Sequence, residues 1–144
     1  MTKQPSPSAR AILLADQIIV EAGTGKKSLI GIYSNLVAPT LPTRQLLHVY
    51  ALLVDAAGTY DFDLELAGLE TGNVIHRGRM EKVFTPGPGV PIELVMRLPA
   101  EFTAYGEYEF RLLHQGRIFA ARKLSVMPPP PPPPPKTAGR HRQN

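Results

Sequence analysis

Tyr60-Asp61-Phe62-Asp63-Leu64-Glu65-Leu66 decides the fold class, because apolar and acidic side chains alternate in it without a break. Successive side chains of a β-strand point to opposite faces, so this stretch predicts a strand with one buried face and one face in water. The same two-residue period recurs in Ile92–Leu98 and in Tyr108–Leu112. No segment keeps a helical period with caps, and the sequence therefore predicts an all-β protein.

Further strands are predicted on both sides of this stretch. Leu46–Val54 is almost wholly apolar, which is typical of a central strand covered on both faces. Ile118–Val126 follows a turn at Gln115-Gly116 and predicts a hairpin. Glycine and proline separate the segments at short intervals, so we expect an immunoglobulin-like β-sandwich of about seven to eight antiparallel strands. The remaining candidate strands are Ile12–Val20, Leu29–Val37 and Val74–Phe84.

Charge predicts one strand register. A hairpin centred on Glu70 would place Asp63 opposite Arg77 and Asp61 opposite Arg79 on the exposed face. The acidic stripe is then a solvated row of ion pairs. The alternative hypothesis, a calcium site or an acid–base pair, needs ligands that converge from loops or a wall that excludes water. A flat strand face offers neither.

The stretch around Phe102 to Phe110 resembles the penultimate strand of immunoglobulin-like domains. In those domains a tyrosine near the start of the strand donates a hydrogen bond to a backbone carbonyl, in a motif called the tyrosine corner. Tyr108 or Tyr105 is expected to play that part. The motif indicates architecture and not activity.

The two ends of the chain differ in composition from its middle. We divide the chain into a flexible N-terminal arm (1–10), a sandwich domain (11–127) and a disordered polyproline and basic tail (128–144). The tail begins with eight consecutive prolines, which form an extended helix without internal hydrogen bonds and are known ligands of aromatic grooves. The tail residues that we expect to interact are Pro128, Pro131, Pro135, Arg140 and Arg142.

The net charge of +4 comes from the ends of the chain. Five of the 16 basic residues are Lys3, Arg10, Lys136, Arg140 and Arg142, whereas all 12 acidic residues lie within 11–127. The folding segment therefore has a net charge of −1. A nucleic-acid-binding domain carries its basic patch within the fold, so we expect no nucleic-acid binding beyond weak contacts of the tail.

The glycine-rich stretch before Leu29 predicts a structural turn and not a phosphate site. Ala22–Ser28 contains Gly25-Lys26, but a phosphate-binding loop needs a glycine where the chain has Val20 and a hydroxyl where it has Lys27. This stretch is interpreted as a glycine-rich turn with solvated lysines. Disulfides, thiol catalysis and metal sites that need thiolate ligands are excluded, because the chain has no cysteine.

The four histidines are widely separated in the sequence, at His48, His76, His114 and His141. We expect His48 to be a hydrogen-bonded residue of the core or rim, and His114 to be exposed beside a hairpin turn. A zinc site built from His48, His76 and a carboxylate is the alternative hypothesis. No residue is assigned as catalytic, cofactor-binding or metal-binding.

The stretches Ala15–Glu21 and Thr24–Tyr33, with the Tyr60–Leu66 strand, resemble a family of bacterial proteins classed as a domain of unknown function. Members share an apolar strand, a Thr-Gly-Lys-x-Ser turn and a Leu-Ile-Gly-Ile-aromatic strand. The resemblance covers about Ile12 to Val126, implies a small β-sandwich protein and transfers no activity.

Three function hypotheses stay open at this point. The first is a non-enzymatic protein-interaction or structural module with an unidentified protein partner, or with a second copy through a sheet edge. The second is a sandwich that binds a small molecule, a carbohydrate or a lipid, and the third is an enzyme with an unrecognised site. The start of the chain is not of the secretory type and no apolar run is long enough to span a membrane, so we expect a cytoplasmic protein without membrane insertion.

Overall fold

The computed structural model of the chain describes residues 4–135. Nine strands and no helix are present among them, which confirms the all-β prediction. The strands are β1 (Ser8–Val20), β2 (Lys27–Tyr33), β3 (Asn35–Val37), β4 (Thr43–Val54), β5 (Gly58–Gly68), β6 (Val74–Thr85), β7 (Ile92–Phe102), β8 (Gly106–His114) and β9 (Arg117–Met127).

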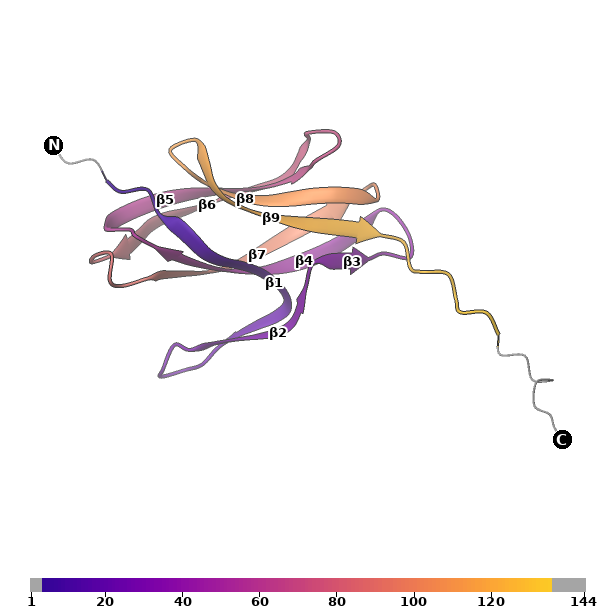
Figure 1. The fold of residues 1–144 in the computed structure, drawn as a ribbon, viewed down its shortest axis with the longest axis horizontal. Helices are drawn as coiled ribbons and strands as arrows, with labels where there is room; N and C mark the ends of the chain where they lie inside the picture. The colour runs from indigo at the N-terminus through magenta and orange to yellow at the C-terminus, as the bar shows by residue number, and fades with distance from the viewer. Residues whose placement is uncertain (1–3, 136–144) are drawn as a thin grey trace.

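The strands form two sheets that pack face to face (Figure 1). The order in the four-stranded sheet, here called sheet A, is β2-β1-β4-β7, and the order in the five-stranded sheet B is β3-β9-β8-β5-β6. Neighbouring strands are antiparallel, except that β3 runs parallel to β9. This arrangement is an immunoglobulin-like β-sandwich, as the alternation predicts.

The predicted strand Leu29–Val37 is divided at Ser34, and this division raises the strand number to nine. The backbone carbonyl of Ser34 accepts a hydrogen bond from the N–H of Ser125 at 3.1 Å. The chain thereby leaves β1, crosses to sheet B and runs for three residues beside β9. The prediction of antiparallel strands is wrong for the β3–β9 pair. A chain that crosses from one sheet to the edge of the other keeps its alternation of apolar and polar residues, so the sequence could not show this crossing.

The core between the sheets is built by strand alternation. On β4, Leu47, Val49 and the two inward residues after them are fully buried. Phe62 of β5 and Phe110 of β8 lie opposite them and are also fully buried. Each completely buried side chain of this size contributes roughly 1.5–3 kcal/mol relative to exposure, so the alternation is the main source of stability.

The tyrosine corner is formed by Tyr108, as expected. Its hydroxyl donates a hydrogen bond to the carbonyl of Ala104 at 2.7 Å, and its ring packs edge-on against Phe102 at 4.9 Å between centroids. Tyr105 has a different role, since its hydroxyl donates to the carbonyl of Ala38 at 2.7 Å. The two tyrosines fasten the start of β8 to neighbouring loops.

The β5–β6 register differs from the prediction by two residues. Asp63 lies opposite Arg79 and Glu65 lies opposite Arg77. The turn accounts for the shift, because the N–H of Gly72 donates to the Gly68 carbonyl and the pairing is irregular just before that turn. Between Phe62 and Leu66 the shift is two, which keeps these side chains on their predicted faces, so the charged row and the buried row are both retained there.

The N-terminal arm is shorter and more firmly held than predicted. β1 begins at Ser8, and residues 4–7 lie against the end of the sandwich. The buried Tyr60 hydroxyl donates a hydrogen bond to the carbonyl of Pro5 at 2.6 Å, and the side-chain amide of Gln4 donates to the carbonyl of Thr59 at 2.6 Å. The prediction of a loose arm through residue 10 is therefore wrong for residues 4–10. The proline-rich composition of this segment could not show that the distant Tyr60 hydroxyl binds its backbone.

β1 changes its pairing partner along its length. Ser8–Ala15 pairs with β4, whereas Leu14–Val20 pairs with β2. Figure 1 shows the hairpin of β1 and β2 bending away on the side of sheet A that faces away from sheet B. The central strand β4 was predicted to be covered on both faces. Its outer face is only partly covered, and Leu46 on that face is 53% exposed.

Candidate interaction surfaces

The partner change of β1 leaves an open seam on one side of the sandwich. Before Leu14, β1 pairs with β4 alone, and before Ser125, β9 pairs with β8 alone. These two stretches of unpaired edge face each other, one from each sheet, and do not pair. We call the gap between Ser8–Leu13 and Arg117–Leu124 the seam. An unpaired edge offers N–H and C=O groups to an added strand.

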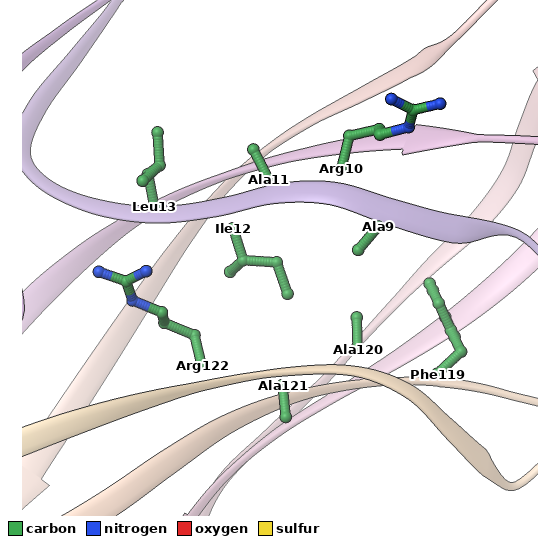
Figure 2. A pocket seen from close by; sticks show the side chains of 9 residues that line it. All are labelled: Ala9, Arg10, Ala11, Ile12, Leu13, Phe119, Ala120, Ala121 and Arg122. Carbon is green, nitrogen blue, oxygen red and sulfur yellow. The ribbon is translucent and has the colours of Figure 1, made fainter.

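The seam contains a cavity of about 440 Å³. Figure 2 shows Ala9 and Ile12 pointing from β1 toward β9, and Phe119 and Ala120 pointing from β9 toward β1. The small alanine side chains leave the space that larger residues would fill. The lining is therefore apolar at its centre, where Phe119 also contacts Phe62 with 5.4 Å between ring centroids.

Each strand that borders the seam carries a β-bulge. Arg10 is the extra residue of β1, between the pairs of Ala9 and Ala11, and Phe119 is the extra residue of β9. Bulges twist a strand and redirect a side chain. The bulge on β9 turns Phe119 toward the seam cavity, next to Ala120. Sequence periodicity could not show this, because one inserted residue only weakens the alternation.

Basic side chains border the apolar centre of the seam. Arg117 and Arg122 lie on the inward face of β9, on either side of Phe119, and Arg122 donates a hydrogen bond to the Ser34 hydroxyl at 2.8 Å. Lys123 is exposed on the opposite face of the same strand. None of the three makes an ion pair within the described part of the chain. The seam is thus an apolar cleft with an uncompensated positive border.

The tip of the β1–β2 hairpin is tied to the far strand of its own sheet. Lys27 Nζ lies 2.8 Å from Glu93 Oε1, and the Tyr50 hydroxyl donates to Glu93 Oε2 at 2.5 Å. β2 and β7 are opposite edges of sheet A, so this contact requires the hairpin to fold back across the outer face. The hydrogen bonds from Lys27 and Tyr50 lower the pKa of Glu93. Burial, and then the hydrogen bond to Glu93, raises the pKa of Tyr50 to about 12.

The glycine-rich turn before Lys27 is structural, in agreement with its interpretation. The N–H of Glu21 donates to the Lys26 carbonyl at 2.8 Å, and the N–H of Gly25 donates to the Glu21 carbonyl at 2.9 Å. A strand follows the turn, as the sequence favoured, and not the helix that a phosphate site needs. Only Lys26 is solvated; Lys27 is largely covered, because it reaches Glu93.

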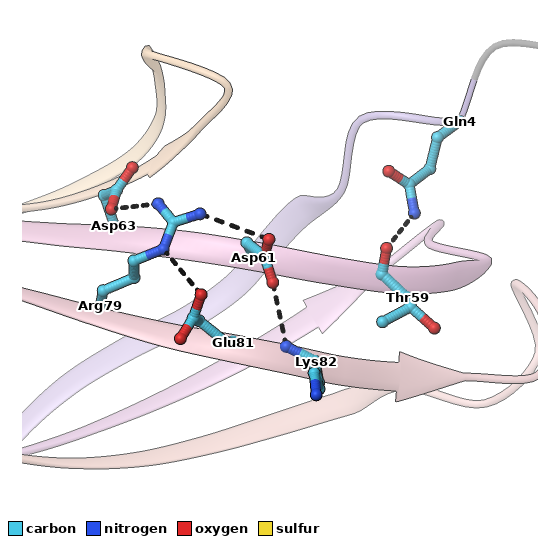
Figure 3. A network of polar contacts seen from close by, with 7 residues as sticks. All are labelled: Gln4, Thr59, Asp61, Asp63, Arg79, Glu81 and Lys82. Carbon is cyan, nitrogen blue, oxygen red and sulfur yellow. Dashed lines mark hydrogen bonds and ion pairs between the residues drawn. The ribbon is translucent and has the colours of Figure 1, made fainter.

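Arginines pair with the acidic stripe on β5, and Arg79 holds Asp61 and Asp63 of that stripe (Figure 3). Arg79 donates to Asp63 at 2.9 Å, to Asp61 at 3.3 Å and to Glu81 at 3.4 Å. Asp61 also accepts a hydrogen bond from the backbone N–H of Lys82, which has a φ of 58° and marks a bulge. The charges lie on an open face and are paired. The solvated ion-pair interpretation is confirmed: Arg79 pairs with Asp61 and Asp63, and Arg77 Nε lies 3.6 Å from Glu65 Oε2.

The histidines do not come together. His48 lies on the outer face of β4 and His76 on β6 of the other sheet. Within residues 4–135, no three histidine or carboxylate side chains are placed to hold a metal ion. His48 Nδ1 is buried without a hydrogen-bond partner, so the expectation of a hydrogen-bonded histidine is wrong for that atom.

His114 is buried, although we expected it to be exposed. It continues the inward series of Tyr108, Phe110 and Leu112 to the last residue of β8 and is only 9% exposed. Its ring lies 5.1 Å from that of Tyr60. A second cavity, of about 420 Å³, lies beside it. Its lining residues are Gln4, Pro5, Ser6, His114, Gln115, Arg117 and Phe119.

The described part of the tail has no regular secondary structure. Pro128, Pro131 and Pro135 are exposed and lead away from the end of β9 (Figure 1). Arg140 and Arg142 lie outside the described residues. Within residues 4–135, no helix is long and apolar enough to cross a membrane.

Strand order, two packed sheets and the tyrosine corner together define an immunoglobulin-like sandwich protein. A family model described as a family of unknown function (DUF6941) matches residues 10–127, and the chain belongs to this family. The sequence resemblance to an uncharacterised family is thereby confirmed. The fold is similar to that of an immunoglobulin-like protein from Pseudomonas aeruginosa. The identity is 17%, the match covers 87% of this chain and 99% of that chain, and the TM-score is 0.43. No curated protein matches the sequence.

Proposed function

We propose that this protein is a non-enzymatic interaction module that contacts a protein partner through the seam. The observation that carries the proposal is that two unpaired strand edges border an apolar cavity. Exposed edges are the usual sites of strand addition, and a small domain gains nothing in stability by leaving them open. Ile118 lies on the outer face of the same edge strand, opposite Leu113, where its exposed side chain would meet an outward side chain of an added strand.

The titratable side chains support a binding role over a catalytic one. The Lys27–Glu93–Tyr50 contact holds the hairpin, and the carboxylates around Arg79 are paired on an open face. Neither set lines either of the two cavities described above. The net charge of −1 over 11–127 supports a protein partner rather than nucleic acid, and the proline run would serve as a tether or second ligand. A cytoplasmic location is part of the proposal.

A quantitative affinity capture from the native lysate tests this function. Baits are the full chain, the chain ending at Met127 and the Ile118→Asp variant, with Phe84→Asp as matched control because Phe84 is also apolar and exposed but lies on β6, at the other edge of sheet B. We expect one protein to be captured stoichiometrically by all baits except Ile118→Asp. Capture that depends on the tail alone would move recognition to the prolines, and capture by no bait would contradict the proposal.

A second candidate function is the binding of a small polar molecule in the cavity beside His114. The histidine, an arginine and two glutamine side chains converge there with Phe119, which gives the few polar groups and apolar wall of a ligand site. Thermal-shift screening of a metabolite panel tests it. A stabilising compound whose effect is lost in Arg117→Ala would support this function over the first.

A further inference from the structure

We propose that the edge of β9 from Arg117 to Leu124 binds an extended acidic segment of the partner by strand addition, with an apolar side chain of that segment entering the seam cavity. The proposal rests on the proposed function and names its site and the chemistry of its partner. The seam offers such a segment three features to recognise, namely a free backbone edge, an apolar centre and two arginines.

The backbone edge is free where an added strand would lie. β3 occupies the outer side of β9 only from Ser125 to Met127. An added strand would continue the line of β3 toward Arg117 and extend sheet B by backbone hydrogen bonds. The chain's own tail is unsuited to this place. It leaves Met127 at the opposite end of β9, and prolines have no N–H to donate.

The inward face of β9 specifies a side-chain pattern. Arg122, Ala120 and Arg117 lie opposite Phe110, Leu112 and His114 of β8 in turn, so the bulge leaves them two ladder steps apart. An added strand places alternate side chains on that face. The complementary segment therefore reads acidic-x-apolar-x-acidic, with its apolar side chain against Phe119 and Ala120.

Charge selects the acidic partner. Arg117 and Arg122 have no carboxylate partner within residues 4–135, and no acidic side chain lines the seam cavity. Arg122 is also positioned by the Ser34 hydroxyl, which holds its guanidinium near the seam. An arginine that is already positioned gives up less rotamer freedom when it meets a carboxylate.

Labelled synthetic peptides test the inference with the full chain. One pool has the pattern Glu-x-Val-x-Glu and a second has Lys-x-Val-x-Lys, where x is threonine or serine. Fluorescence polarisation should show binding of the acidic pool to the native chain. The double variant Arg117→Glu/Arg122→Glu should bind the acidic pool about tenfold more weakly and should prefer the basic pool. Lys123→Glu is the matched control, since it reverses a charge on the same strand but on the other face.

The outcomes separate this inference from the broader function. Equal loss in Lys123→Glu and in the double variant would indicate general electrostatic attraction and overturn the inference. So would failure of the native chain to bind the acidic pool. A native dimer that dissociates in the double variant, measured by sedimentation, would make a second copy the occupant instead. If the captured native partner binds the double variant as strongly as the native chain, the protein is still an interaction module, but the seam is not its binding site. Circular dichroism and urea midpoints confirm that each variant is folded.

Discussion

Replacement of Tyr60 by phenylalanine measures how firmly the N-terminal arm is held. The side chain is 1% exposed, and its ring stacks on Phe62 with 5.5 Å between centroids, a contact that phenylalanine retains. The hydroxyl donates to the Pro5 carbonyl at 2.6 Å and accepts from the Ala57 N–H at 3.0 Å. Losing one net hydrogen bond costs about 1 kcal/mol, and an unsatisfied buried N–H costs about 1–3 kcal/mol more. We expect a loss of about 2–4 kcal/mol in the free energy of unfolding.

The contribution of the arm is isolated by repeating the substitution in a chain that begins at Ser8. Pro5 is absent there, so Tyr60→Phe should cost about 1 kcal/mol less than in the full chain. Urea unfolding followed by circular dichroism gives both values, provided that the dependence of the unfolding free energy on urea is unchanged. Equal costs in the two chains would refute the reasoning, since the Pro5 contact would then contribute nothing to stability.

Three further predictions concern the hairpin and the charged face. Gly31→Ala places a methyl group against the Asp16 carboxylate at a φ of 70° and should destabilise the chain by about 1–3 kcal/mol, measured by urea unfolding. Tyr50 should titrate near pH 12 by phenolate absorbance and closer to 10 in Glu93→Gln, so its contribution to stability is complete below pH 10 and is lost as the pH rises through 12. Arg79→Gln should leave the urea midpoint nearly unchanged despite three carboxylate contacts, because Arg79 is half exposed and solvent screens these ion pairs, and a clear drop in the midpoint would contradict this.

Features that depend on the alternation of apolar and polar side chains were predictable from the sequence. Features that depend on which strands pair with each other were not. The buried series of β5 and β8 and the tyrosine corner follow from a period of two and a local hydrogen bond, so they were visible in the residues themselves. The place of His114 was also contained in the period, and the expectation of exposure came from giving the nearby turn more weight. The division at Ser34 depends on contacts with residues about 90 positions away.

The seam could not be predicted from the residues that form it. It exists because β1 leaves β4 for β2 after Ala15 and because β3 is only three residues long. Both are facts of strand pairing, which a single sequence does not encode locally. Arg117 and Arg122 looked like ordinary members of a hairpin strand, and only the unpaired edge gives them a role.

The partner change of β1 also has a mechanical consequence. β1 and β9 run in the same direction, and the described chain enters the sandwich at one end and leaves it at the other (Figure 1). Tension applied between these two ends would pull β1 and β9 lengthwise in opposite senses. Such a load shears the β1–β4 and β8–β9 ladders along their whole length, so that many hydrogen bonds resist together. A chain tethered by its proline run could therefore carry force without unfolding strand by strand.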